Sequence, residues 1–230
     1  MRILKGNGSR ALALTVVLAW SATAAHGQAV AADPARWEAD IAAFEAQDRE
    51  SPPPTGGIVF TGSSSIRLWE TLATDFPGLP VINRGFGGSQ VPDVTAFVER
   101  IVTKHRPRQV VIYCGGNDIA AGRSAAEVLA DTKALVKAIH AKLPETRIAY
   151  ISVAPNPARW SQVGTVGAVN RAIADWMATD PRLAFIDVFT HMLGADGLPK
   201  PDIFVDDRLH MNEKGYAIWR EVVGPSLQRE

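Results

Sequence analysis

The sequence predicts one α/β domain, a three-layer α/β/α sandwich with a five-stranded parallel sheet in the middle. Five short apolar runs alternate with longer amphipathic stretches, and this alternation is typical of parallel strands joined by helices on both faces of a sheet. The run at residues 109–113 has a continuous β-branched centre, as in strands that are buried on both faces. The length of 230 residues, 47% of them hydrophobic, suits a single domain that needs no disulfide or metal to hold its core.

The first 27 residues do not fit this domain. A basic start with Arg2, Lys5 and Arg10 is followed by an apolar run over residues 11–25, and Ala25-His26-Gly27 ends the run with small residues at the key positions. We expect a secretory signal peptide over residues 1–27, and therefore a periplasmic or secreted protein. The apolar stretch is short for a membrane span, although an uncleaved N-terminal anchor is the alternative. No cysteine follows the run, which excludes a lipoprotein anchor.

The charge balance argues against two classes of partner. The chain has 24 basic and 24 acidic side chains, so nothing in it points to nucleic acid or to an anionic membrane surface. Loss of residues 1–27 would remove three basic and no acidic side chains, which leaves a formal net charge of −3. We expect no segment of the remaining chain to insert stably in a membrane. The single cysteine, Cys114, excludes an internal disulfide and a cysteine-rich metal site. Its place at the end of an apolar run predicts a buried, inert thiol.

Residues 28–56 are expected to form an N-terminal helix and a linker in front of the main domain at residues 57–230. Pro34 suits the first turn of a helix, and Trp37, Ile41 and Phe44 recur on one helical face. The segment at 51–57, which is rich in proline and glycine, then breaks the helix.

The elements of the main domain follow in order. We expect strands over residues 58–61, 81–83, 109–113, 147–153 and 183–187, and helices over residues 64–72, 91–104, 124–142, 161–178 and 212–227. Right-handed connections would place the loops after all five strands at one edge of the sheet, where open α/β sheets carry their chemistry. Residues that follow an apolar run are therefore the first candidates for a site.

Two such turns contain serine or glycine. After the first strand comes Gly62-Ser63-Ser64-Ser65, and a serine at a strand-to-helix turn is exposed where the helix dipole favours developing negative charge. A serine that only caps a helix is the ordinary alternative. After the second strand, the glycines of residues 83–89, among them Gly88, would let the backbone approach a ligand closely. A plain flexible turn is the alternative here, and a nucleotide-binding loop has the wrong spacing.

After the third strand comes Gly115-Gly116-Asn117-Asp118. A side-chain amide that follows two glycines can point at a substrate oxygen, as an oxyanion donor must. The alternative is an ordinary Gly-Asn turn followed by an aspartate cap.

Before the last helix, Asp207 stands three residues ahead of His210. Its carboxylate could hold the imidazole Nδ1–H and leave the other ring nitrogen to accept a serine proton. Asp206 is the second choice for this role, and a solvated helix cap is the alternative reading of His210. His191, with Asp187 four residues ahead of it, is the rival pair, although Asp187 ends a strand.

Together these segments resemble the four blocks of the SGNH hydrolases, the GDSL-like lipase and esterase superfamily. The matching residues are Gly62-Ser63-Ser64, Gly88, Gly115-Gly116-Asn117-Asp118 and Asp207-x-x-His210. The resemblance extends from about residue 57 to residue 225, and it implies a flavodoxin-like sheet with neither a metal nor a cofactor. It implies Ser64 as nucleophile, His210 as general base and then general acid, and Asp207 as the group that orients His210. The oxyanion hole would consist of the backbone N–H groups of Ser64 and Gly88 and the side-chain amide of Asn117.

One block departs from the superfamily pattern. The first block usually reads Gly-Asp-Ser, and Ser63 replaces this aspartate, which is not a member of the triad. Ser64 is chosen by its alignment with the glycine, so Ser63 and Ser65 remain alternatives. The segment Ile66-Arg67-Leu68-Trp69 resembles the branch related to platelet-activating-factor acetylhydrolases.

We therefore expect an exported serine esterase that hydrolyses short acyl esters, above all acetyl esters, through a Ser-His-Asp triad and an acyl-enzyme. No long insertion is available to form a lid, and export favours small esters or acetylated carbohydrates as substrates. Three other functions are weighed against it. Acetyl transfer to a carbohydrate would use the same site. A non-catalytic carbohydrate-binding protein would not need an oriented base. A flavodoxin-like nucleotide binder would leave the Asp-x-x-His pair unexplained. Trp160, after the fourth strand, is expected to be a packed loop residue rather than a wall of the acyl pocket.

Overall fold

The computed structural model describes residues 34–228, and the predicted signal peptide lies outside the described residues. Its centre is a sheet of five parallel strands in the order β2-β1-β3-β4-β5, which confirms the predicted sheet. The strands are β1 (Ile58–Gly62), β2 (Val81–Gly85), β3 (Gln109–Tyr113), β4 (Arg147–Ile151) and β5 (Leu183–Ile186). Because β2 lies on one side of β1 and β3 on the other, strand order reverses at β1. A crevice opens beyond the carboxyl ends of strands at such a point.

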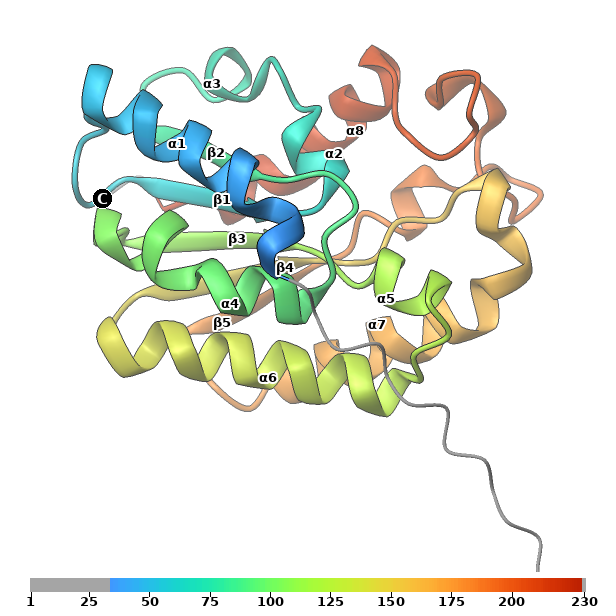
Figure 1. The fold of residues 1–230 in the computed structure, drawn as a ribbon. Helices are drawn as coiled ribbons and strands as arrows, with labels where there is room; N and C mark the ends of the chain where they lie inside the picture. The colour runs from blue at the N-terminus through green and yellow to red at the C-terminus, as the bar shows by residue number, and fades with distance from the viewer. Residues whose placement is uncertain (1–33, 229–230) are drawn as a thin grey trace, which may run out of the picture. The chain divides into compact units, whose positions relative to one another are not determined.

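Helices cover both faces of this sheet (Figure 1). The α-helices are α1 (Glu38–Glu50), α2 (Ser64–Arg67), α3 (Leu72–Asp75), α4 (Val91–Ile101), α5 (Gly116–Ala120), α6 (Ala125–Lys142), α7 (Val163–Met177) and α8 (Glu213–Val223). Short 3-10 turns are η1 (Pro34–Trp37), η2 (Thr103–His105), η3 (Pro157–Gln162), η4 (Thr190–Met192), η5 (Pro201–Ile203) and η6 (Gly224–Ser226). Helices α1, α4, α6 and α7 form one layer, and α2, α3 and α8 belong to the other.

Successive side chains along a strand point to opposite faces of the sheet. Alternate strand residues therefore pack into two different hydrophobic cores, one on each face. Val59 and Val110 pack beneath the layer of α1, α4, α6 and α7, whereas Phe60 and Val111 pack beneath α2, α3 and α8. All five residues of β1 and all five of β3 are buried. Burial on both faces explains why these runs are continuously apolar instead of alternating.

The predicted helix at 64–72 is divided into α2 and α3. The chain turns between Leu68 and Thr71, and the indole N–H of Trp69 donates to the Asp75 carboxylate at 2.7 Å. Trp69 is only 1% exposed, so burial of this large side chain prevails over a continuous helix. The short helix α5 was not predicted, and β4 ends at Ile151 instead of residue 153.

The N-terminal helix is fastened to the rest of the domain. Trp37 packs edge-to-face on Phe86, with ring centroids 5.5 Å apart, and α1 packs against α4. Asp48 at the end of α1 forms an ion pair with the buried guanidinium of Arg84 in β2. The described residues 34–228 accordingly belong to one compact unit.

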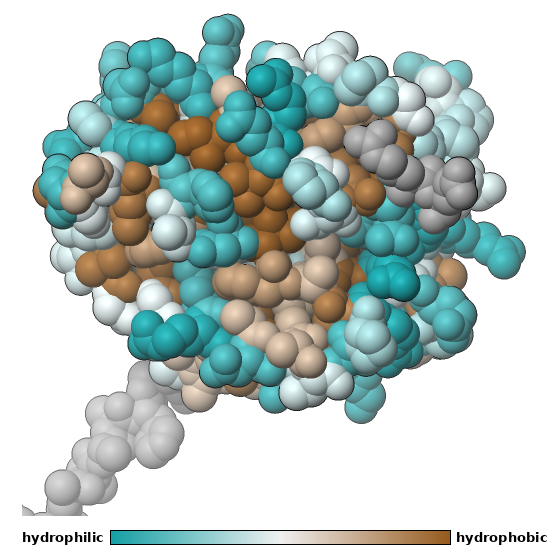
Figure 2. Space-filling view, turned by 180° about the vertical axis from the view of Figure 1, so that it is seen from behind, coloured by the Kyte–Doolittle hydropathy of each residue, from teal (hydrophilic) through white to brown (hydrophobic). Residues whose placement is uncertain are grey.

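The side opposite to that of Figure 1 shows apolar residues gathered within a hydrophilic border (Figure 2). Among the described residues, the exposed large hydrophobic side chains are Leu198 and Val205, so much of this apolar surface belongs to partly buried core residues. No helix in the described part of the chain is long and apolar enough to cross a membrane.

Candidate active site

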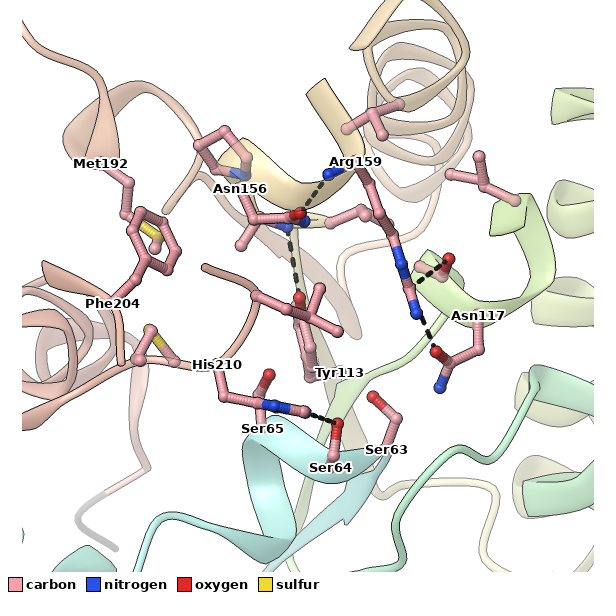
Figure 3. A pocket seen from close by; sticks show the side chains of 18 of the residues that line it. Ser63, Ser64, Ser65, Tyr113, Asn117, Asn156, Arg159, Met192, Phe204 and His210 are labelled. Carbon is pink, nitrogen blue, oxygen red and sulfur yellow. Dashed lines mark hydrogen bonds between the residues drawn. The ribbon is translucent and has the colours of Figure 1, made fainter. Parts of the chain in front are cut away.

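Segments that are far apart in the sequence meet beyond the carboxyl ends of the strands. Ser64 begins α2 directly after β1, Asn117 lies in α5 after β3, and His210 precedes α8. Their side chains converge on one cavity, and Arg159 of η3 lies beside Asn117, across the cavity from Ser64 and His210 (Figure 3). The sheet edge therefore gathers the residue types that the sequence placed there.

Gly62 makes the tight turn that presents Ser64. Its φ of +128° is one that residues with a side chain rarely adopt, and a Cβ there would lie 1.9 Å from the carbonyl oxygen of Tyr113. The next N–H, that of Ser63, donates to the same carbonyl at 2.9 Å. Ser63 and Ser65 are buried, whereas Ser64 is only partly buried.

The imidazole of His210 joins Ser64 to Asp207. Its Nε2 lies 2.8 Å from Ser64 Oγ, and its Nδ1 lies 2.5 Å from Asp207 Oδ2. Asp207 Oδ1 accepts the backbone N–H groups of Leu209 and His210 at 2.8 and 2.9 Å. Burial by itself would raise the pKa of Asp207, but these hydrogen bonds outweigh it and lower the pKa to about 2.

This hydrogen bonding defines the roles that the ring can take. At neutral pH Asp207 is a carboxylate, which accepts the Nδ1–H and leaves Nε2 as the acceptor for the proton of Ser64. Of the three adjacent serines, Ser64 is the one whose hydroxyl meets the imidazole.

The rival groups are placed elsewhere. Asp206 is exposed and forms no hydrogen bond with His210 among the contacts of residues 34–228. The carboxylate of Asp187 accepts the N–H and the hydroxyl of Thr190, so it closes a turn and does not orient His191. Neither His191 nor Asp187 lines the cavity at Ser64.

The predicted oxyanion donors lie around Ser64. Gly88 has a φ of +76°, and its backbone N–H finds no acceptor within residues 34–228, nor does that of Ser64. Asn117 Nδ2 donates one proton to the carbonyl of Ser89 at 3.1 Å. A primary amide carries a second N–H, so Asn117 retains a donor for a substrate oxygen.

Arg159 holds the amide of Asn117 and was not anticipated from the sequence. Its Nη1 donates to Asn117 Oδ1 and to the carbonyl of Gly116, both at 3.1 Å. A guanidinium can only donate, so the oxygen of the amide must face Arg159 and the nitrogen must face Ser89 and the cavity. Asn156 in turn accepts the backbone N–H of Arg159 at 2.8 Å.

Buried groups hold the loops beneath the site. The carboxylate of Asp118 accepts the N–H of Val91, the first residue of α4, at 3.1 Å, and burial raises the pKa of Asp118 to about 6. The hydroxyl of Ser89 donates to Phe86 and Gly62 carbonyls. Cys114 is fully buried, and burial raises the pKa of its thiol, in agreement with the predicted inert thiol.

Ser64 and His210 lie between two hollows. One is a small cavity of about 40 Å³. Its apolar lining consists largely of Ile119, Val153, Val166, Met192, Phe204 and Met211. The other is an open groove of about 410 Å³ on the side of Trp37, Arg67 and Gly88. Trp160 is not among the lining residues of either, so it does not form a wall of the acyl pocket.

Sequence comparison adds the relationship to known proteins. The model of the GDSL-like lipase/acylhydrolase family matches residues 55–218. The chain belongs to this family. It is accordingly a carboxylic ester hydrolase with the α/β fold of the SGNH enzymes. Within residues 34–228, no group of three or more histidine, cysteine, aspartate or glutamate side chains could hold a metal ion.

Individual proteins of this kind resemble the chain along most of its length. The human platelet-activating factor acetylhydrolase IB subunit alpha1 is 28% identical over 195 residues, which cover 79% of this chain and 78% of that protein. A GDSL-like lipase from Bacteroides thetaiotaomicron superimposes with a TM-score of 0.71 and 19% identity, covering 82% of this chain and 97% of that one. An acetylxylan esterase from Geobacillus stearothermophilus gives a TM-score of 0.61 and 17% identity, covering 76% and 97%.

Proposed function

We propose that this hydrolase is an exported serine esterase that removes short acyl groups, above all acetyl, through Ser64, His210 and Asp207. The observation that carries the proposal is the unbroken chain of hydrogen bonds from Ser64 Oγ through the imidazole to the Asp207 carboxylate. A nucleophile, a base and a group that orients the base are the parts required for acyl transfer.

In the first half of the reaction, Ser64 Oγ attacks the carbonyl carbon while its proton passes to His210 Nε2. The negative charge that develops on the carbonyl oxygen is stabilised by the N–H groups of Ser64 and Gly88 and the amide of Asn117. The protonated imidazole, held by Asp207, then gives its proton to the departing alkoxide. The alcohol leaves and the acyl group stays on Ser64 as an ester.

In the second half, water takes the place of the alcohol. His210 Nε2 accepts a proton from the water, whose oxygen attacks the acyl carbon in the same oxyanion hole. Collapse of the intermediate returns the proton to Ser64 Oγ and releases the carboxylic acid. The open groove beside Ser64 gives solvent a path to this step.

The small cavity supports a short acyl group. About 40 Å³ corresponds to a few water-sized spheres of roughly 10–15 Å³ each, which matches the few heavy atoms of an acetyl group. The apolar lining of the cavity suits a methyl group. The name of one relative, platelet-activating factor acetylhydrolase, and that of one structural neighbour, an acetylxylan esterase, favour the same choice.

Export to the periplasm or the medium is proposed from the leader pattern of residues 1–27. Small esters or acetylated carbohydrates would be the substrates met there. Acetyl transfer to a sugar would use the same acyl-enzyme, and the presence of a second product with a sugar acceptor distinguishes it from hydrolysis.

The test is the hydrolysis of p-nitrophenyl esters from acetate to decanoate by the mature protein and by Ser64→Ala. We expect kcat/KM to fall as the acyl chain lengthens and activity to be lost in Ser64→Ala. Ser63→Ala is the matched control, and it should retain activity because its hydroxyl does not contact His210. Equal activity in Ser64→Ala and the wild type would refute the assigned nucleophile.

A further inference from the structure

The open groove outside Ser64 differs in charge from the apolar cavity. Its charged lining consists of two guanidinium groups, Arg67 and Arg159, and one carboxylate, Asp40. The imidazole of His210 lines the same groove. Two guanidinium groups against one carboxylate give the groove an excess of positive charge, whereas the whole chain has a formal net charge of zero.

Two arginines flank the glycine loop that supplies a predicted oxyanion donor. A Cβ on Gly87 would lie 2.9 Å from Arg67 Nε, and a Cβ on Gly88 would lie 3.6 Å from Arg36 Nη2. Arg36 also lies over Trp37, with its guanidinium carbon 4.4 Å from the ring centroid. The bare backbone of the two glycines thus lets both guanidinium groups approach the groove, and the indole fixes one of them.

These charges are not neutralised by the protein. Arg84, Arg100 and Arg182 each form an ion pair with a carboxylate. Within residues 34–228, neither Arg67 nor Arg36 has such a partner within 4.0 Å, and Asp40 forms no ion pair with them. Arg67 and Arg36 are exposed, and therefore their donors are available to a ligand.

An ester bound at Ser64 must place its two ends in different hollows. The cavity of about 40 Å³ accepts only a small acyl group, so the alcohol part has to extend into the groove of about 410 Å³. The alcohol part then lies beside Arg67, which lines the groove. Arg36 borders the groove at Gly88, where its Nη2 would lie 3.6 Å from a Cβ.

We propose that the natural substrate is an ester whose alcohol part carries an anionic group of the carboxylate or phosphate type, bound by Arg67 and Arg36. Guanidinium groups bind both kinds of oxyanion through paired N–H donors. The inference rests on the proposed function, because it assigns the alcohol side of the reaction at Ser64.

The test uses four acetylated phenols that differ in the charge of a group remote from the ester. They are 4-acetoxyphenylacetate and 4-acetoxybenzylphosphonate as anions, 4-acetoxyphenylacetamide as the neutral form and 4-acetoxyphenethyl-trimethylammonium as the cation. We expect kcat/KM to be about three to ten times higher for the better anion than for the neutral amide, and lowest for the cation. The preferred anion identifies the ligand as carboxylate or phosphate type. Raising the salt concentration to about 0.5 M should reduce the preference through screening.

Variants locate the effect. In Arg67→Gln and Arg36→Gln, the ratio of kcat/KM for the anion to that for the amide should fall toward one. Arg171→Gln removes an exposed charge on α7 and should keep the wild-type ratio. A wild-type ratio of one or below, or an equal fall in all three variants, overturns the inference. Hydrolysis of the neutral amide that depends on Ser64 would leave the proposed function intact in that case, whereas no hydrolysis of any of the four would count against both.

Discussion

At the residue scale, the imidazole of His210 is the centre of the site, because both of its nitrogens have a partner that fixes their roles. Asp207 reaches Nδ1 and Ser64 reaches Nε2. All three residues could be named from the sequence, although the sequence contains no distances. Ser64 was predictable because a parallel sheet brings strand ends to one edge. Asp207 and His210, which precede α8, were predicted from their spacing and from the resemblance to the superfamily blocks.

Substitution of the two adjacent aspartates should separate their roles. Asp207→Asn should lower kcat by about 10⁴, because an amide favours the wrong imidazole tautomer and cannot stabilise the protonated ring. Asp206→Asn should leave kcat near the wild-type value, since Asp206 is exposed and does not contact His210. The two variants are compared by steady-state kinetics with p-nitrophenyl acetate. Similar losses in both would contradict the assignment of Asp207.

With an uncharged substrate such as p-nitrophenyl acetate, Arg159 should act on the reaction through Asn117. Asn117→Ala should lower kcat by about 10²–10³, as expected for loss of one oxyanion donor. Arg159→Gln should lower kcat by less and leave KM nearly constant, because it frees the amide to rotate. The double variant should be no slower than Asn117→Ala, since the two residues act as a unit. Additive losses on a logarithmic scale would show a separate role for Arg159.

The sequence did not predict that Arg159, Arg67 and Trp37 lie at the site, and the reason is physical. Each belongs to a segment whose place depends on tertiary packing, and none stands in a motif that predicts its contacts. Arg159 contacts Asn117, which is 42 positions away in the sequence. Trp37 of η1 contacts Phe86, which directly follows β2. An apolar face at helical spacing did predict that Trp37 is buried, but not that it would border the groove.

At the element scale, the end of β1 is the position on which the site depends most. Gly62 pairs with Gly85 of β2 and with Tyr113 of β3, so the turn to Ser64 occurs on a strand that has neighbours on both sides. β1 and β3 were predictable because burial on both faces leaves a largely continuous apolar run. The division of 64–72 into α2 and α3 was not, because it results from burial of Trp69 and its bond to Asp75.

A pair of glycine substitutions should distinguish local crowding from backbone strain. Both Gly62 (φ +128°) and Gly78 (φ +80°) have positive φ, but only at Gly62 would a Cβ meet backbone, 1.9 Å from Tyr113 O. Gly78→Ala should lower the free energy of unfolding by about 1–3 kcal/mol. Gly62→Ala should lower the free energy of unfolding by more, because the added Cβ would also force β1 away from β3. Urea denaturation measures both free energies. Equal effects would mean that the approach of β1 to β3 is not essential.

At the scale of the whole molecule, the N-terminal helix completes the groove. The family match begins at residue 55, and Trp37 and Asp40, which precede it, nevertheless line the groove together with Ser64.

Two buried titratable groups make the stability of the fold depend on pH. Burial raises the pKa of Asp118 from 3.8 to about 6 and lowers the pKa of His105 from 6.5 to about 4.

These two groups should give the stability opposite pH dependences. Between pH 3.8 and 6 the folded state binds more protons at Asp118 than the unfolded state does, so this group lowers the free energy of unfolding as pH rises. Between pH 4 and 6.5 the folded state binds fewer protons at His105, so this group raises it. Each contributes a slope of at most about 1.4 kcal/mol per pH unit. Asp118→Asn should therefore make stability rise more steeply with pH.

Urea denaturation of the wild type and Asp118→Asn from pH 4 to 7 measures these slopes. Asp175→Asn, an exposed change on α7, is the control and should keep the wild-type slope. A slope for Asp118→Asn that equals or falls below that of the wild type would show that Asp118 does not retain its proton in the fold.

The most direct test of the central claim is to label the nucleophile and identify the labelled residue. The mature protein is treated with an alkyl fluorophosphonate, which phosphonylates an activated serine, and the peptide that ends at Arg67 is sequenced by tandem mass spectrometry. We predict one phosphonyl group on Ser64, none on Ser63 or Ser65, and greatly slowed labelling in His210→Ala. A label on either neighbouring serine, or labelling of Ser64 at an unchanged rate without His210, would contradict the catalytic arrangement described here.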